Sequence, residues 1–118
     1  MNVNKSGLWG EIYAARYLRD HAYEIIAGNY RCRMGEIDII ARKDGVVCFV
    51  EVKTRGEGML FRPMEAVDAG KRSRLVSAAA HYMHLTGEAF VSRFDVIEVT
   101  LDAQNQPARI HHIPNAFT

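Results

Sequence analysis

The stretch Gly35-Glu36-Ile37-Asp38-Ile39-Ile40, followed after a turn by Phe49-Val50-Glu51-Val52-Lys53, decides the fold of this 118-residue chain. Apolar and polar side chains alternate in both runs, as is typical of strands that have one buried face. The segment between them contains Asp44-Gly45, the strongest short hairpin signal when apolar runs flank it. The sequence therefore predicts an antiparallel β-hairpin in which Lys43 pairs with Val46 across the turn.

A two-residue loop also determines which residues of the hairpin face each other. Counting outward from it places Asp38 opposite Glu51 and Glu36 opposite Lys53. Direct cross-strand partners share a face, with Cβ atoms roughly 4.5–5.5 Å apart. Two carboxylates this close repel each other, so a shared proton, a nearby cation or a bound metal must offset the repulsion. A bulge or an odd loop would instead send the acids of the two strands to opposite faces.

The acids of the hairpin lie within apolar runs, where charged side chains are disfavoured. A functional pair of Asp38 and Glu51 is therefore favoured over solvated charges on an open sheet. Oxygen donors without a nearby Cys or His point to Mg²⁺ or Mn²⁺. Lys53 either pairs with Glu36 or faces the metal site to hold the scissile phosphate or activate water, and the two roles are compatible. Three roles are equally favoured for Glu36: a third metal ligand, an ion-pair partner of Lys53, or an exposed charge at the start of the strand.

Helical periodicity from about Ser6 to about His21 predicts a first helix. Its stripe consists of Leu8, Glu11, Ala15, Leu18 and Ala22. An acid in or beside an apolar stripe needs a partner. Glu11 either reaches the metal edge of the sheet or extends from the flank of the helix into water.

The remaining elements are predicted from periodicity and turn residues. They are a short strand at 25–27 followed by a turn or bulge at Gly28-Asn29, a loop at 54–63, a helix at about 68–85, a strand at 90–101, and an edge strand at 109–113 bounded by Pro114. The second helix has a stripe of Lys71, Leu75, Ala78, Tyr82 and Leu85. This order favours a single domain, residues 1–118, with a central sheet and helices packed against it.

Charge and cysteine content limit the classes of protein. The formal net charge of +1 argues against a strongly basic nucleic-acid coat and leaves local patches. Lys71, Arg72 and Arg74 oppose the macrodipole at a helix start, so phosphate contact would explain them, although a solvated face suits Arg72 and Arg74 equally. The two cysteines lack metal-ligand spacing, and no signal segment precedes them, so we expect a reduced, cytoplasmic chain. We expect no membrane association, because no apolar run is long enough to span a bilayer.

The histidine pairs are weak candidates for a zinc site. His111 and His112 are adjacent in a strand, so they face opposite ways and make a poor bidentate pair. A zinc protein is the least favoured class.

Gly35–Asp38 and Val50–Arg55 together resemble the YraN family of small, largely uncharacterised bacterial proteins. The resemblance spans nearly the whole chain and includes Gly10-Glu11, Arg93-Phe94-Asp95-Val96 and a final Asn115-Ala116-Phe117. One departure is Arg62, where relatives usually carry glycine after the phenylalanine.

The YraN family resembles a minimal member of the restriction-endonuclease-like superfamily, whose signature is Asp, a spacer, then Glu-x-Lys. The signature corresponds to Asp38, Glu51 and Lys53, and an acid on the first helix of related Holliday-junction resolvases corresponds to Glu11. The resemblance implies an α/β fold with a mixed sheet and Mg²⁺-dependent hydrolysis of phosphodiester bonds.

The resulting hypothesis is a metal-dependent nuclease acting on DNA, including branched or damaged DNA. Asp38 and Glu51 would hold Mg²⁺ or Mn²⁺ with Glu11, and Lys53 would act beside them. The residues assigned to flanking phosphates are Lys71, Arg55 and Arg33. The alternative is a non-catalytic nucleic-acid-binding or adaptor protein on the same scaffold. The sequence does not distinguish turnover from binding alone, or DNA from RNA as the substrate. It is compatible with a homodimer and with a separate partner protein.

Overall fold

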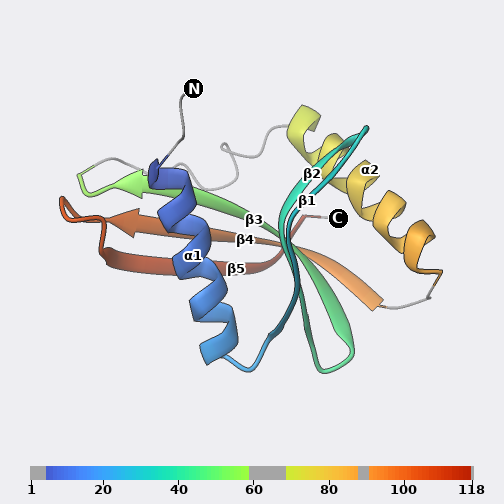
Figure 1. The fold of residues 1–118 in the computed structure, drawn as a ribbon, viewed down its shortest axis with the longest axis horizontal. Helices are drawn as coiled ribbons and strands as arrows, with labels where there is room; N and C mark the ends of the chain where they lie inside the picture. The colour runs from blue at the N-terminus through green and yellow to red at the C-terminus, as the bar shows by residue number, and fades with distance from the viewer. Residues whose placement is uncertain (1–4, 59–68, 88–90, 118) are drawn as a thin grey trace.

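A computed structural model describes residues 5–58, 69–87 and 91–117 of the chain (Figure 1). The elements in chain order are α1 (Lys5–Asp20), β1 (Glu24–Cys32), β2 (Gly35–Lys43), β3 (Val46–Gly56), α2 (Ala69–Thr86), β4 (Val91–Leu101) and β5 (Pro107–Phe117). The sheet has the order β1-β2-β3-β4-β5, with β3 and β4 parallel and the other pairs antiparallel. The expected α/β fold with a mixed sheet and flanking helices is confirmed.

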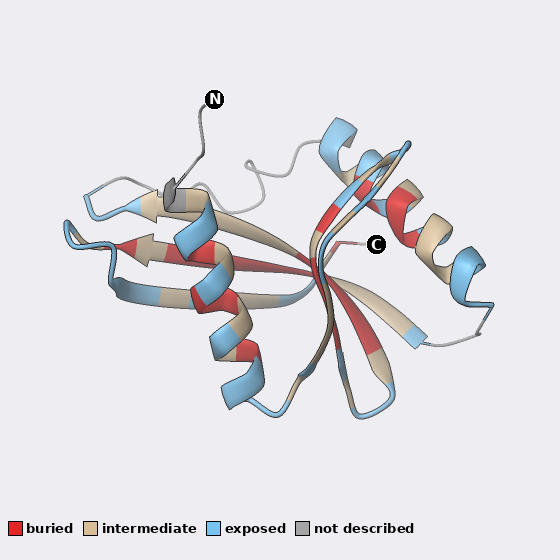
Figure 2. Cartoon of the chain, viewed as in Figure 1, coloured by how far each residue is buried: buried red, intermediate tan, exposed pale blue. Residues whose placement is uncertain are grey.

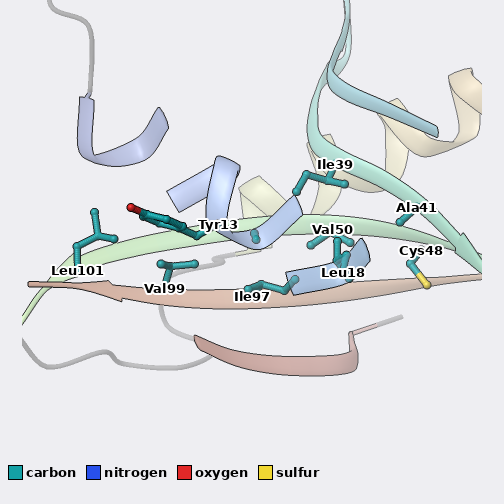
Figure 3. Packing of buried hydrophobic residues seen from close by; sticks show 10 residues of the cluster. Tyr13, Leu18, Ile39, Ala41, Cys48, Val50, Ile97, Val99 and Leu101 are labelled. Carbon is teal, nitrogen blue, oxygen red and sulfur yellow. The ribbon is translucent and has the colours of Figure 1, made fainter. Parts of the chain in front are cut away.

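The two helices cover opposite faces of the sheet, because neighbouring residues of the central strands belong to different cores. Cys48 and Val50 of β3 pack with α1, whereas Val47 and Phe49 pack with α2. Figure 3 shows the first core, with Tyr13 and Leu18 of α1 lying over β3 and β4. Buried residues concentrate along the middle of the strands, as Figure 2 shows. The sheet is thus covered on both faces.

The hairpin between β2 and β3 begins as predicted. Asp44 and Gly45 have φ angles of 52° and 78°, and two positive φ values are the requirement of a type I′ turn. The ladder runs from Lys43↔Val46 to Ile39↔Val50, in the expected register, and pairs no residues beyond that point. The predicted ladder pairs of Asp38 with Glu51 and of Glu36 with Lys53 are therefore wrong.

Strand β2 leaves β3 at Asp38. The Asp38 side chain, through Oδ2, accepts the Val52 N–H at 2.8 Å. Ile37 packs in the α2 core and Ile39 in the α1 core, although strict alternation places both on one face. Figure 1 shows β1 and β2 curving out of the plane of the sheet, with their connecting turn beside α2. This bend carries the start of β2 toward the second helix.

The buried face of α1 is rotated from the predicted stripe. Tyr13, Ala14 and Leu18 are buried, whereas Leu8 is exposed and Ala22 lies beyond the helix in an exposed turn. Gly10 is also buried, and a Cβ there would collide with the Thr54 side chain of β3. The absence of a side chain at Gly10 allows α1 to approach β3 closely. The predicted stripe missed this contact because it was built from the spacing of apolar side chains, and glycine has none.

Several predicted boundaries are wrong in the same direction, because the strands are longer than their apolar runs. Strand β1 continues through Gly28 to Cys32, with a bulge near Ile26. Strand β3 continues to Gly56, so the predicted loop does not begin at Thr54. Strand β5 passes through Pro114 to Phe117, which an edge strand permits.

The predicted buried stripe of α2 is only partly correct. Leu85 is exposed rather than part of the buried stripe of α2, whereas Leu75 and Ala78 are buried as predicted. The Phe61-Arg62-Pro63 segment and Phe90 lie outside the described residues. Neither described helix is long and apolar enough to cross a membrane.

Candidate functional site

Asp38 and Glu51 come together by a route other than the predicted ladder. Glu51 stays on β3 with a side chain 17% exposed. The bend in β2 turns Asp38 toward it, and the two carboxyl groups share a hydrogen bond. Burial, followed by the charge of Glu51, raises the pKa of Asp38 to about 8. At neutral pH the metal-free pair therefore holds a proton, which is one of the expected ways of offsetting the repulsion.

Lys53 lies beside this pair. Its Nζ is 3.3 Å from Glu51 Oε1, and only 14% of its side chain is exposed. Lys71, from the first turn of α2, brings a second ammonium within 4.0 Å of the same oxygen. Burial and then the neighbouring Lys71 lower the pKa of Lys53. Lys53 thus pairs with Glu51 rather than with Glu36, and two cations from different elements converge on one acid.

Glu36 takes one of the roles left open for it. Its Oε2 lies 3.4 Å from Arg31 Nε of β1, and both side chains are largely exposed. In this structure it is an exposed charge at the start of β2, paired across the β1–β2 hairpin.

Glu11 approaches the site from α1 and is left unsatisfied. Its Oε1 is buried and has no hydrogen-bond partner among the described residues. Burial and then the charge of Glu36 raise its pKa; Arg31 opposes this effect and Glu51 adds to it. An orphaned carboxylate oxygen beside other acids is costly without a cation.

The acids fit a divalent cation in chemistry, although they do not form a ready cage. Within the described segments, no three Asp, Glu, His or Cys side chains gather into a group that could hold a metal. A protonated Asp38 against Glu51 and an unpartnered Glu11 oxygen would nevertheless each be relieved by Mg²⁺ or Mn²⁺, which take oxygen ligands. The chemistry of these oxygen donors thus suits a divalent cation, but the described residues do not hold them in a ready metal-binding group.

The residues assigned to phosphate contacts divide into two groups. Lys71 and Arg33 line a pocket of about 410 Å³ that also contains Glu51. Arg55 is half-buried on β3, where it pairs in register with Thr100 of β4. Arg33 and Lys71 thus lie at the pocket beside Glu51, whereas Arg55 is not among the residues that line it.

One buried acid was not singled out as a site. Asp95 of β4 is 0% exposed and accepts hydrogen bonds from the Arg93 guanidinium at 2.9 and 3.1 Å and from the Asn115 N–H at 3.0 Å. His112 Nε2 lies 2.7 Å from its other side. An Asp inside an apolar strand was the signal used for Asp38, and it applies equally to Phe94-Asp95-Val96. Asp95 is an internal anchor of the fold rather than part of the site.

Three of the five histidines contact side chains outside the acid pair. His111 contacts Glu98 at 3.0 Å, His112 contacts Asp95, and His81 contacts the Tyr30 hydroxyl at 2.6 Å.

The class of protein is now defined: a mixed α/β sheet of the restriction-endonuclease-like type, with an acid pair and a lysine where β2 and β3 separate. The chain belongs to the uncharacterised protein family UPF0102, whose model matches residues 10–99. This is the YraN family, so the resemblance is confirmed.

Relatives in this family match the chain over nearly its whole length. It is 40% identical to a UPF0102 protein of Caldicellulosiruptor bescii, over 99% of this chain and 100% of the relative. It is 43% identical to one of Moorella thermoacetica, over 99% and 98%, and 44% identical to one of Geobacter metallireducens, over 97% and 93%. Family membership is thus clear, and it assigns no activity.

The protonated acid pair predicts an unusual pH dependence of stability. A carboxyl whose pKa rises on folding stabilises the fold only while protonated, so its contribution is lost as pH rises from 3.8 to about 8. In metal-free buffer at pH 8 to 9, Asp38→Asn should therefore raise the free energy of unfolding by about 1–3 kcal/mol, with no gain at pH 4. Urea denaturation at both pH values measures this, and an Asp20→Asn control on exposed α1 should show no such trend. A loss of stability at pH 9 would contradict the assigned protonation.

Proposed function

We propose that this protein is a metal-dependent nuclease that hydrolyses phosphodiester bonds of DNA. The observation that carries the proposal is the convergence of Asp38, Glu51 and Lys53 where β2 separates from β3, with one buried oxygen of Glu11 left unsatisfied. Four partly buried ionisable groups at one place are costly for folding, and such clusters are concentrated at functional sites.

Each residue has a distinct role in this proposal. Asp38 and Glu51, with Glu11, would hold Mg²⁺ or Mn²⁺, which supplies Lewis-acid polarisation of the phosphate and an acidified water. Lys53 Nζ would hold a non-bridging phosphate oxygen, because it is already fixed beside Glu51 at 3.3 Å. Lys71 and Arg33 would bind flanking phosphates from the pocket side. Glu36, ion-paired with Arg31, would limit the positive charge at the rim.

Metal binding is the first test, and it has a readout independent of cleavage. Titration calorimetry with Mn²⁺ or Mg²⁺ should show binding to the wild-type chain and none to Asp38→Asn. Because Asp38 is protonated at pH 7 without metal, binding should release close to one proton, which buffers of different ionisation enthalpy reveal. The Asp20→Asn control should bind as the wild type does. Binding unaffected by Asp38→Asn would contradict the proposed ligand set.

The second candidate is a non-catalytic nucleic-acid-binding or adaptor protein on the same scaffold. It is favoured by the lack of a ready three-ligand group among the described residues. With a net charge of only +1, such a protein would rely on a partner protein for part of its nucleic-acid affinity. Metal-dependent nicking of branched, nicked or single-stranded DNA supports the nuclease. Metal-independent binding without nicking supports the adaptor.

A further inference from the structure

A pocket lies between the β1–β2 turn and the first turns of α2, directly beside the candidate site. Its volume is about 410 Å³, and Glu51 of the site is also part of its lining. Arg33 and Met34 line it from the turn, and Lys71 and Arg74 line it from α2. Anything bound in this pocket therefore lies next to the acid pair.

The two walls of the pocket approach each other closely at Gly35. A Cβ placed on Gly35 would lie 2.6 Å from the Arg74 carbonyl oxygen. Only glycine permits this approach, because backbone cannot move aside as a flexible side chain does. The bend of β2 at Asp38 brings the turn here, so one feature of the fold positions both the acid pair and the pocket.

The pocket has more positive than negative side chains. Arg31, Arg33, Lys71 and Arg74 line it, against Glu36 and Glu51. Arg31 faces Glu36 and Lys71 faces Glu51, whereas Arg33 and Arg74 form no ion pair with the described part of the chain. Two exposed guanidiniums that form no ion pair with the described residues are suited to a phosphate, which arginine binds through paired N–H donors.

Apolar surface lies beside this charge. Met34 at the turn is 41% exposed, and Leu75 forms part of the pocket from the buried face of α2. A flexible, polarizable thioether suits the flat face of a nucleobase. Phosphate-binding arginines next to an apolar wall match the two halves of a nucleotide, and the volume lies in the range of small-ligand sites.

We propose that this pocket takes one unpaired nucleotide of a nucleic-acid strand, so that the cut falls next to a single-stranded or unstacked position. The bases of an intact duplex are stacked inside the helix and cannot enter a pocket of this size without leaving the stack. The proposal deepens the nuclease function and rests on it for the position of the cut. Occupancy of the pocket does not depend on cleavage.

Cys32 provides a direct probe of occupancy. It lines the pocket, whereas Cys48, the other cysteine, is 0% exposed and has its pKa raised by burial to about 11. In EDTA, alkylation of the folded wild type should thus occur at Cys32 and be absent from Cys32→Ser. A short oligothymidylate should slow it at least about fivefold at saturation, and a blunt duplex at matched occupancy should not. Equal protection by both, or by neither, would overturn the proposal.

A second measurement uses binding affinity and exposed side chains. Arg74→Ala should weaken oligothymidylate binding in EDTA about tenfold by fluorescence anisotropy, and change duplex binding less than about twofold. Arg109→Ala, on the exposed edge strand β5, is the matched control and should change neither. Equal weakening for both ligands would indicate a general electrostatic surface and overturn the assignment. Both pocket measurements are made in EDTA and do not depend on cleavage. A failure of the protein to cleave DNA, or cleavage that needs no metal, therefore contradicts the nuclease proposal alone.

Discussion

Replacing Lys53 with alanine is expected to lower metal-dependent DNA cleavage by at least about 100-fold, while DNA affinity changes less than about threefold. Lys53 is 14% exposed and lies 3.3 Å from Glu51. Under the proposed function, its ammonium is thus held beside the transferring phosphate, where negative charge develops. A buried, fixed ammonium stabilises that charge far more than a mobile surface lysine does. Affinity depends instead on the exposed cations of the pocket, which the substitution leaves in place.

Parallel cleavage and anisotropy measurements test this separation. Lys43→Ala is the matched control, because Lys43 lies at the far end of β2 with its ammonium 5.0 Å from the Tyr23 ring centre. It should cleave as the wild type does. Unchanged cleavage by Lys53→Ala would contradict the assigned role. Loss of affinity in step with cleavage would make Lys53 a binding residue instead.

The start of the hairpin could be predicted because its information is local. Asp44 and Gly45 both adopt positive φ, which few residue pairs tolerate, and the register follows from that turn for as long as the strands stay paired. A count of residues cannot detect where pairing stops. Where it stops, the Asp38 side chain accepts the Val52 N–H in place of a backbone carbonyl of β2, and Ile37 packs in the other core.

Three of the predicted site residues, Asp38, Glu51 and Lys53, do lie together, but by a geometry other than the predicted one. Asp38 meets Glu51 through the bend rather than through a ladder pair, and Lys53 meets Glu51 rather than Glu36. The pocket could not be predicted at all, because it depends on a long-range contact of Gly35 with the Arg74 backbone. Glycine has no side chain that a hydrophobic pattern could include. Gly10 and Gly35 nevertheless determine how closely the helices approach the sheet.

Asp95→Asn is expected to destabilise the protein by about 3–5 kcal/mol, a large part of the 5–15 kcal/mol typical of a domain. Every contact that the structure gives Asp95 is to a donor: two from Arg93, one from the Asn115 N–H and one at His112 Nε2. An asparagine NH₂ would face at least one of these donors and leave the Arg93 guanidinium uncompensated. Arg93 also donates to the Tyr23 hydroxyl at 2.7 Å, so the change would loosen β4, β5 and the start of β1 together.

The pH dependence of this anchor is opposite in sign to that of Asp38. Burial disfavours ionisation of Asp95, but hydrogen bonds from His112 and Arg93 outweigh it and hold its pKa below 3.8. Its contribution is present above that pH and is lost as pH falls through the folded pKa. Urea denaturation at pH 7 should thus show the full loss for Asp95→Asn, and the difference from wild type should shrink toward pH 2. Asp20→Asn should stay within about 0.5 kcal/mol throughout. A pH-independent difference would mean that packing, rather than the charge of Asp95, stabilises this part of the fold.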